Sequence, residues 1–242
     1  MSDVLEKLRD DAQYYGAFGK QYLSNSDIGT LLSNPSDFGV SRADNQAFAQ
    51  GRLFHQLILE PQKAEDWKFV DVSSRNTKAY KEFVAENNLE FALLEKENLH
   101  IRNLVDVMMG NMDFYDDIRH EGNEYEVPAV GEIEGLMWKG KADIVHPEML
   151  IDIKTTSKIS DFKWSARKYN YDSQCYIYQE LFGKPLVFYV IDKTNNQLGI
   201  FRPTEEFVKG GRDKVKRAVE VYNKFFSKDA TDDISFYYVE EY

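Results

Sequence analysis

Alternating stretches of hydrophobic and polar residues divide this chain of 242 residues into helices and strands. Apolar residues that recur three and four positions apart are typical of amphipathic helices, whereas strict alternation is typical of strands. On this basis we predict helices over residues 4–22, 26–33, 45–59, 77–86, 98–109, 172–182 and 205–226. We predict strands over residues 67–72, 124–130, 135–145, 150–156, 186–191 and 200–203.

Particular positions add detail to these elements. Ser26 is expected to cap the second helix, and Gly210-Gly211 lie inside the last helix or break it. Pro128 has no backbone N–H, so its strand is expected at an edge or end of the sheet. Residues 158–171 interleave basic and aromatic side chains and are predicted to be a loop. Two helices are expected to bury stripes made of Phe48, Leu53, Leu57 and Ile58, and of Leu99, Leu104, Val105 and Met108.

The order of the elements indicates an α/β fold in which helices flank a central mixed sheet. No Pro/Ser-rich linker or internal repeat interrupts the chain, so we predict one domain over residues 1–242. Within it, residues 1–115 form a helical part, 116–203 the sheet core with the active site, and 204–242 a helix and tail.

Composition excludes several classes of site. Cys175 is the only cysteine, which rules out an iron–sulfur cluster, a Cys-rich zinc site and any disulfide within one chain. Its apolar and aromatic neighbours favour a buried side chain over a nucleophile. The sequence contains no apolar run long enough to cross a membrane and no signal-peptide pattern at its start. We therefore expect a cytoplasmic protein that does not interact with membranes.

Charge is distributed unevenly along the chain. The formal net charge is −11, which opposes binding to nucleic acid. Residues 135–170, however, form a local basic island that could receive a polyanion. Interleaved cations and rings suit a nucleic acid strand, although a partly buried aromatic loop would show the same pattern. The candidate DNA-binding residues are Lys139, Lys141, Lys158, Lys163, Trp164, Arg167 and Lys168.

The strongest chemical signal lies in the predicted hairpin over residues 135–156. Asp143 is on its first strand, and Asp152 and Lys154 are two positions apart on its second, which places both on one face. A surface hairpin with a salt bridge would explain these charges. Two carboxylates on adjacent strands can also share Mg²⁺, and a neighbouring lysine can act on the attacking water or the phosphate. This set of residues fits metal-assisted phosphodiester hydrolysis.

The same residues resemble a known signature. Asp143, followed by Asp152-Ile153-Lys154, is similar to the PD-(D/E)xK nuclease motif without its proline. Segments that resemble, in order, the blocks of the exonuclease VIII (RecE-type) family are 51–61 (GRLFHQLILEP), 136–143 (LMWKGKAD), 151–156 (IDIKTT) and 171–178 (YDSQCYIY). Residues 22–35 resemble the family's opening helix, and the similarity spans roughly residues 22–225.

This resemblance implies a restriction-endonuclease-like core and a 5′ to 3′ exonuclease acting on double-stranded DNA ends. It also implies dependence on Mg²⁺, with Mn²⁺ as a substitute, a phage or bacterial setting, and pairing with a single-strand annealing protein. Members of the family tend to form rings around DNA, which could focus local basic islands into one channel.

The resemblance also assigns roles to individual residues. His55, Asp143 and Asp152 would bind metal together with the Ile153 carbonyl, although a lone histidine on a helix is more often structural. Lys154 would point at the water and the scissile phosphate rather than serve as the partner of Asp152. The remaining assignments are Gln174 and Tyr178, which would orient the lysine or the DNA end, and Glu126 or Glu124 as an additional acid.

Two other functions remain open. The same fold and metal site would also suit a structure-specific endonuclease or nickase. Alternatively, a non-catalytic DNA-end-binding or recombination protein could use the nuclease scaffold, although such a protein has no reason to retain His55, both aspartates and Lys154 together.

Overall fold

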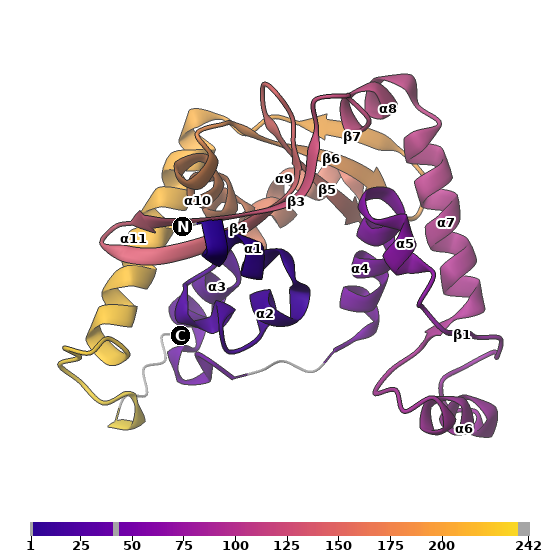
Figure 1. Ribbon diagram of the computed structural model, residues 1–242, viewed down its shortest axis with the longest axis horizontal. Helices are drawn as coiled ribbons and strands as arrows, with labels where there is room; N and C mark the ends of the chain where they lie inside the picture. The colour runs from indigo at the N-terminus through magenta and orange to yellow at the C-terminus, as the bar shows by residue number, and fades with distance from the viewer. Residues whose placement is uncertain (1, 41–43, 237–242) are drawn as a thin grey trace.

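A five-stranded sheet forms the centre of the molecule in the computed structural model, which describes residues 2–40 and 44–236 (Figure 1). The strands lie in the order β3-β4-β5-β6-β7. Their bounds are β3 Glu124–Ile133, β4 Leu136–Val145, β5 Leu150–Thr156, β6 Leu186–Asp192 and β7 Leu198–Phe201. Only β5 and β6 run parallel, and the other neighbours are antiparallel. The predicted α/β fold with a mixed sheet is therefore confirmed.

Helices cover both faces of this sheet (Figure 1). One face packs against α3 (Asn25–Ser33), α10 (Tyr171–Phe182) and α11 (Glu205–Phe225). The other packs against α4 (Gln46–Leu59), α7 (Glu95–Met109) and α8 (Met112–Ile118). Strand β6 is buried throughout because its alternate side chains enter the two cores. The remaining helical elements are α1 (Ser2–Arg9), α2 (Asp11–Tyr15), η1 (Gly19–Gln21), η2 (Pro35–Asp37), α5 (Pro61–Ala64), α6 (Lys78–Glu86), η3 (Ile159–Asp161), α9 (Phe162–Lys168) and η4 (Ile234–Phe236).

Strands β3 and β4 form a hairpin at the edge of the sheet, whereas the hairpin predicted over residues 135–156 is β4 with β5, which also pair antiparallel. The turn between β3 and β4 is made by Glu134 and Gly135, which both have positive φ, as a tight two-residue hairpin turn requires. Strand β3 is an edge strand, as Pro128 predicted. Helix α10 approaches β4 at Gly140, where a Cβ atom would lie 3.0 Å from the Tyr178 ring. The absence of a side chain at Gly140 thus brings α10 close to the two strands that carry the candidate site.

Several predicted elements differ in extent or type. The strand expected over residues 67–72 is only β1 (Phe69–Val70), which pairs in parallel with β2 (Leu93–Leu94). The helix expected over residues 4–22 is divided into α1, α2 and η1, because Asp10 caps a new helix. The second helix is capped by Ser24 rather than Ser26, since Ser24 and Asp27 form a capping box. Residues 158–171, predicted to be a loop, contain η3 and α9.

The last helix is continuous through both glycines. At Gly211 a Cβ atom would lie 1.9 Å from the Asp172 carbonyl oxygen, so this glycine permits α11 to cross α10 closely. Two residues of the predicted core stripes face solvent instead, with Phe48 52% exposed and Leu99 60% exposed. On α4 the buried residues are Ala49, Leu53, Phe54, Ile58 and Leu59. The core-facing stripe is therefore rotated away from Phe48.

Candidate active site

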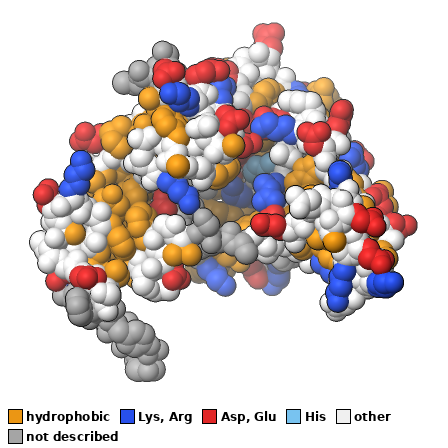
Figure 2. All heavy atoms as spheres, turned by 60° about the horizontal axis from the view of Figure 1, so that its bottom comes forward, with side chains coloured by type: hydrophobic (Ala, Val, Ile, Leu, Met, Phe, Trp, Pro, Cys, Tyr) orange, Lys and Arg blue, Asp and Glu red, His pale blue; other side chains and the backbone are white. Residues whose placement is uncertain are grey.

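A cleft of about 670 Å³ lies where β3, β4 and β5 meet the N-terminal helices. Helix α2 contributes Asp11, Tyr14 and Tyr15 to its lining, and α4 contributes Phe48, Arg52 and His55. Figure 2 looks onto the molecule from below the view of Figure 1 and shows a surface hollowed near its middle. The predicted residues that line the cleft are His55, Glu126, Lys141, Asp143, Asp152, Lys154, Gln174 and Tyr178.

Asp143 occupies the point at which β4 separates from β5. The described pairing of these strands consists of Ile144 with Ile151 and Val145 with Leu150. Beyond Ile151 the strands diverge, and Asp143 Oδ2 accepts the Ile153 N–H at 2.8 Å. Ala142 and Ile144 enter opposite cores although they are two positions apart, so the strand changes face at Asp143. This change of face directs the carboxylate into the cleft.

Asp152 is almost completely buried, with 1% of its surface exposed. Its Oδ1 accepts a hydrogen bond from Gln174 Nε2 at 2.5 Å, and its Oδ2 forms an ion pair with Lys154. Oδ2 accepts no hydrogen bond of ordinary geometry among the described residues. Burial raises the pKa of Asp152. The Lys154 ammonium lowers this pKa and the nearby Asp143 carboxylate raises it, and the net result is a raised pKa.

Lys154 is thus the ion-pair partner of Asp152, whereas we expected its side chain to be free for water and phosphate. The two side chains share a face of β5 and lie close enough to pair. Burial lowers the pKa of Lys154, but Asp152 and the other nearby groups raise it more, and the net pKa lies above its usual value. The Tyr171 ring, 5.2 Å from the ammonium, also contacts this cation.

His55 lies on the face of α4 that lines the cleft. Its Nδ1 is 3.4 Å from Asp143 Oδ2. Phe48, Arg52 and His55 follow helical spacing on this face, while the opposite face fills the core. Burial lowers the pKa of His55, but the Asp143 carboxylate raises it more, and the net pKa is raised. Burial likewise raises the pKa of Asp143, but His55, Lys154 and the Ile153 N–H depress it to below its usual value.

Glu126, rather than Glu124, is the acid that β3 contributes to the cleft. The strand register places it opposite Asp143, whereas Glu124 is exposed beside the end of β4. Its φ of 50° is uncommon for a residue other than glycine, and such strain is found where a side chain is held for function. Burial and the Asp143 carboxylate raise the pKa of Glu126 to about 8.

His55, Glu126 and Asp143 form a candidate metal-binding cluster. One ligand atom from each residue lies within 4.8 Å of the other two. Carboxylates suit Mg²⁺ and Mn²⁺, and the imidazole is compatible with a divalent cation. Asp152 lines the same cleft, with its Oδ2 paired to Lys154. The donor set therefore fits a divalent metal ion.

Comparison with known proteins identifies the family of this chain. A family model described as a PDDEXK-like domain of unknown function (DUF3799) matches residues 36–234. The chain belongs to this family. Our prediction of a PD-(D/E)xK fold is thereby confirmed, while the narrower resemblance to RecE-type exonucleases stays a prediction. A search of curated proteins finds no match.

A solved structure shows the same fold as this PDDEXK-like chain. The crystal structure of a putative exonuclease from Eubacterium rectale is 18% identical, covers 88% of this chain and 86% of its own, and has a TM-score of 0.64. A second structure, of the protein SSO0001, is 14% identical over 91% of this chain and 85% of its own. Its TM-score is 0.38, too low to bear on the fold.

Gln174 and Tyr178 project from α10 of the PDDEXK-like domain toward β4 and β5. Gln174 is hydrogen bonded to Asp152 rather than to Lys154. The Tyr178 hydroxyl donates to the Lys141 carbonyl at 2.9 Å, and burial raises its pKa well above the usual value. Within the described structure, Gln174 therefore orients an acid, and Tyr178 holds β4 in place.

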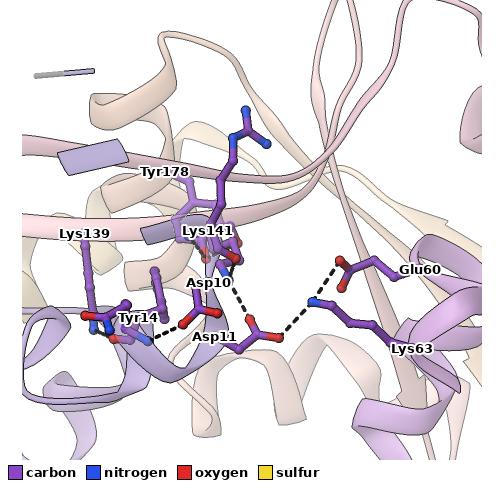
Figure 3. Close-up of polar contacts among 10 residues, drawn as sticks. Asp10, Asp11, Tyr14, Glu60, Lys63, Lys139, Lys141 and Tyr178 are labelled. Atoms are coloured by element: carbon purple, nitrogen blue, oxygen red, sulfur yellow. Dashed lines mark hydrogen bonds and ion pairs between the residues drawn. The ribbon is translucent and has the colours of Figure 1, made fainter. Parts of the chain in front are cut away.

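Lys139 and Lys141, which we expected to bind DNA, are buried and have partners within the protein (Figure 3). Lys139 Nζ donates to the Tyr14 carbonyl at 2.5 Å. Lys141 Nζ donates to the Arg9 carbonyl at 3.3 Å and contacts Asp11 at 2.7 Å. Asp11 also pairs with Lys63, which contacts Glu60. We therefore leave both lysines out of the proposed DNA surface.

The other candidate DNA-binding residues lie on or near α9 and are exposed, with Trp164 65% exposed. Lys163, Trp164 and Arg167 line a separate cavity of about 280 Å³. Lys158 instead lines a cavity of about 330 Å³ that shares Thr155 and Tyr171 with the cleft. Cys175 is buried, and burial raises its pKa, which agrees with a structural side chain.

Sequence reasoning missed several residues that line the cleft, namely Asp11, Tyr15, Phe48, Arg52 and Glu60. The spacing of Phe48, Arg52 and His55 could have indicated a common face, because they are four and three positions apart. We found no local signal for Asp11 or Tyr15, since the position of α2 depends on long-range contacts.

Proposed function

We propose that this PDDEXK-like chain is a metal-dependent exonuclease that hydrolyses phosphodiester bonds from the ends of linear double-stranded DNA. The observation that carries the proposal is the convergence of His55, Glu126 and Asp143 beside the Asp152–Lys154 pair. A structural salt bridge alone gives no reason for three further ionisable groups to converge there. In a non-catalytic protein this arrangement would have a cost and no use.

Each side chain has a distinct part in the proposed reaction. His55, Glu126 and Asp143, with Asp152 beside them, would hold Mg²⁺ or Mn²⁺. When bound, this cation would supply charge neutralisation at the phosphate and a more acidic water. The Ile153 carbonyl remains a predicted ligand. The Ile153 N–H holds Asp143, which fixes the direction of that carboxylate.

Lys154 would act as a fixed positive charge. Its raised pKa keeps the ammonium protonated at neutral pH, so it cannot accept a proton from water. It can instead stabilise negative charge that develops on the phosphate oxygens. Gln174 would act as a positioning residue, because its amide orients Asp152 beside the lysine.

The finer features of the proposal follow from the resemblance to RecE-type exonucleases. They are 5′ to 3′ polarity, dependence on Mg²⁺, cooperation with a single-strand annealing protein in recombination, and a ring-shaped homo-oligomer. We treat residues 1–242 as one nuclease domain. No helix within residues 2–40 and 44–236 is long and apolar enough to span a membrane.

Digestion of linear duplex DNA would test this proposal. Duplexes labelled at the 5′ or the 3′ end would be incubated with Mg²⁺, Mn²⁺ or EDTA, alongside covalently closed circles. We expect metal-dependent release of mononucleotides or short products from the 5′ label, and intact circles. Cleavage of circles would favour an endonuclease or nickase, and no metal-dependent cleavage of any DNA would contradict the proposal.

Two carboxamide variants provide a matched comparison. Asp143→Asn removes a ligand charge from the cleft, whereas Asp116→Asn makes the same change at an exposed position on α8. We expect cleavage to be lost only in Asp143→Asn, with both variants folded by circular dichroism.

A further inference from the structure

The catalytic cleft continues into a second cavity of about 640 Å³. The two cavities share four aromatic residues, Tyr14, Tyr15, Phe48 and Tyr178. We call this second cavity the aromatic arm. It provides a continuous path from the candidate metal cluster to a region lined by rings, hydroxyls and amides.

Two of the shared rings are exposed. Tyr15 on α2 is 69% exposed and Phe48 on α4 is 52% exposed. Tyr14, beneath Tyr15, is buried, and its ring lies 5.0 Å from that of Tyr15 in an edge contact. Lys139 and Lys141 contact the Tyr14 ring at 4.2 Å and 4.7 Å. The buried Tyr14 ring therefore fixes the position of the Tyr15 ring, most of which is exposed to solvent.

The distance of Phe48 from the candidate metal cluster matches the length of a few nucleotides. It precedes His55 by seven residues on the same face of α4, which corresponds to roughly 10 Å along the helix axis. This is about three nucleotide rises of ~3.4 Å in stacked DNA. A strand whose phosphate lies at the metal cluster could thus place a nearby base against Phe48.

A third cavity, which we call the hydroxyl arm, leaves the cleft past Thr155 and Tyr171 and has a different lining. Hydroxyl side chains and two lysines, Lys158 and Lys193, line it together with Asp161 and with the rings of Phe162, Tyr169 and Tyr171. Hydroxyls and lysines suit phosphate oxygens. The lining of the aromatic arm has as many lysines (Lys20 and Lys139) as aspartates (Asp27 and Asp37), and the exposed rings Tyr15 and Phe48, which it shares with the cleft, can stack on bases.

From these two exposed rings at the junction of the cleft and the aromatic arm, we propose that the aromatic arm binds unpaired bases of the DNA strand, by stacking on Tyr15 and Phe48. This inference rests on the proposed function, because it requires DNA in the cleft. It adds a base-stacking subsite, and it implies that the strand is separated from its complement on this side of the metal cluster. Stacking is tolerant of sequence because every base has a flat face.

Binding measured in EDTA would test the subsite independently of cleavage. The probe is a forked duplex with 2-aminopurine in an unpaired arm, compared with the same fork carrying abasic sites in that arm. We expect the wild-type protein to quench 2-aminopurine fluorescence and to bind the base-containing fork more tightly. Phe48→Ala and Tyr15→Ala should each lose quenching and weaken binding of that fork by roughly 5- to 150-fold.

Three controls separate stacking from other effects. Tyr115→Ala removes a ring from α8 that is about as exposed as Phe48 and lies outside both cavities, and it should bind as the wild type does. Phe48→Ala should bind the abasic fork as well as the wild type, because the lost contact is with bases. Lys193→Ala should weaken binding of both forks alike and reduce the salt dependence.

The possible outcomes distinguish this inference from the proposed function. If Phe48→Ala and Tyr15→Ala keep wild-type binding and quenching while the wild type digests linear duplex, the aromatic subsite is wrong and the exonuclease proposal stands. If the wild-type protein neither binds the forks nor cleaves DNA with metal, both are wrong. Melting temperatures of the two variants should match the wild type, because both rings are exposed.

Discussion

Strands β4 and β5 both carry lysines, but the lysines of β4 make structural contacts, whereas the lysine of β5 lies in the candidate active site. On β4, Lys139 and Lys141 point to the N-terminal helices and contact the Tyr14 carbonyl, the Arg9 carbonyl and Asp11. On β5, Lys154 points into the cleft and pairs with Asp152. The residue type and local charge are similar, so what distinguishes the strands is the element packed against each one. The two lysines of β4, held by backbone carbonyls and by Asp11, stabilise the fold, whereas Lys154 lies beside the carboxylates of the candidate metal cluster, where it is available for chemistry.

The largest expected effect is on catalysis, at Lys154. Lys154→Gln should lower the cleavage rate by about 10²–10³-fold, because a neutral amide cannot stabilise the developing phosphate charge. The rate would be measured on short linear duplexes at saturating Mg²⁺. Lys141→Met should retain most of the rate per folded molecule. If Lys154→Gln and Lys141→Met lose the same fraction of the cleavage rate, Lys154 has no catalytic role beyond that of Lys141, and the proposed difference between the two strands is wrong.

The second effect concerns stability, at Lys141. Lys141→Met leaves the Arg9 carbonyl without its donor and Asp11 without one of its two cations. We expect the free energy of unfolding to fall by about 1–3 kcal/mol, the size typical of hydrogen bonds made by a charged group. Urea titration would measure this change. Lys168→Met, at an exposed position on α9, is the matched control and should change stability little.

Much of the fold could be predicted because its elements have strong local signals. Helix α10 ends at Gly183, whose φ of 67° fits a helix C-terminus, and β6 is a continuous apolar run. Helix α9 was missed because it has only seven residues, too few for a clear helical period. Phe48 was placed in the core because periodicity identifies an apolar face but not a cleft that exposes part of it.

The candidate site could be predicted only in part. The spacing of Asp152 and Lys154 is visible in the sequence because a strand has a period of two. The position of Asp143 depends on a change of face in β4, and that of Glu126 on a positive φ, neither of which has a local signature here. Asp11 reaches the cleft wall through ion pairs with residues more than fifty positions away.

A third expected effect is a pH dependence that arises at Glu126, the acid that β3 contributes to the cleft. Its pKa is about 8 in the folded protein and near 4.5 when unperturbed, so between these values the folded state binds the additional proton. The contribution of this group to stability is therefore present at low pH and is lost as the pH rises toward 8. Glu126→Gln cannot titrate, so the difference in melting temperature between this variant and the wild type should shift in favour of the variant from pH 5 to pH 8.5, in EDTA.

Added Mg²⁺ should reverse this trend in the wild type, because a cation that binds the cluster stabilises the carboxylate form of Glu126. Glu124→Gln is the matched control, since Glu124 is exposed and lies outside the cleft. A parallel pH profile in all three proteins would show that Glu126 is not held as a protonated acid. If Mg²⁺ in addition raises the melting temperatures of the wild type and of Glu126→Gln equally, Glu126 does not bind the cation, and β4 and β5 are left as the strands that form the candidate metal site.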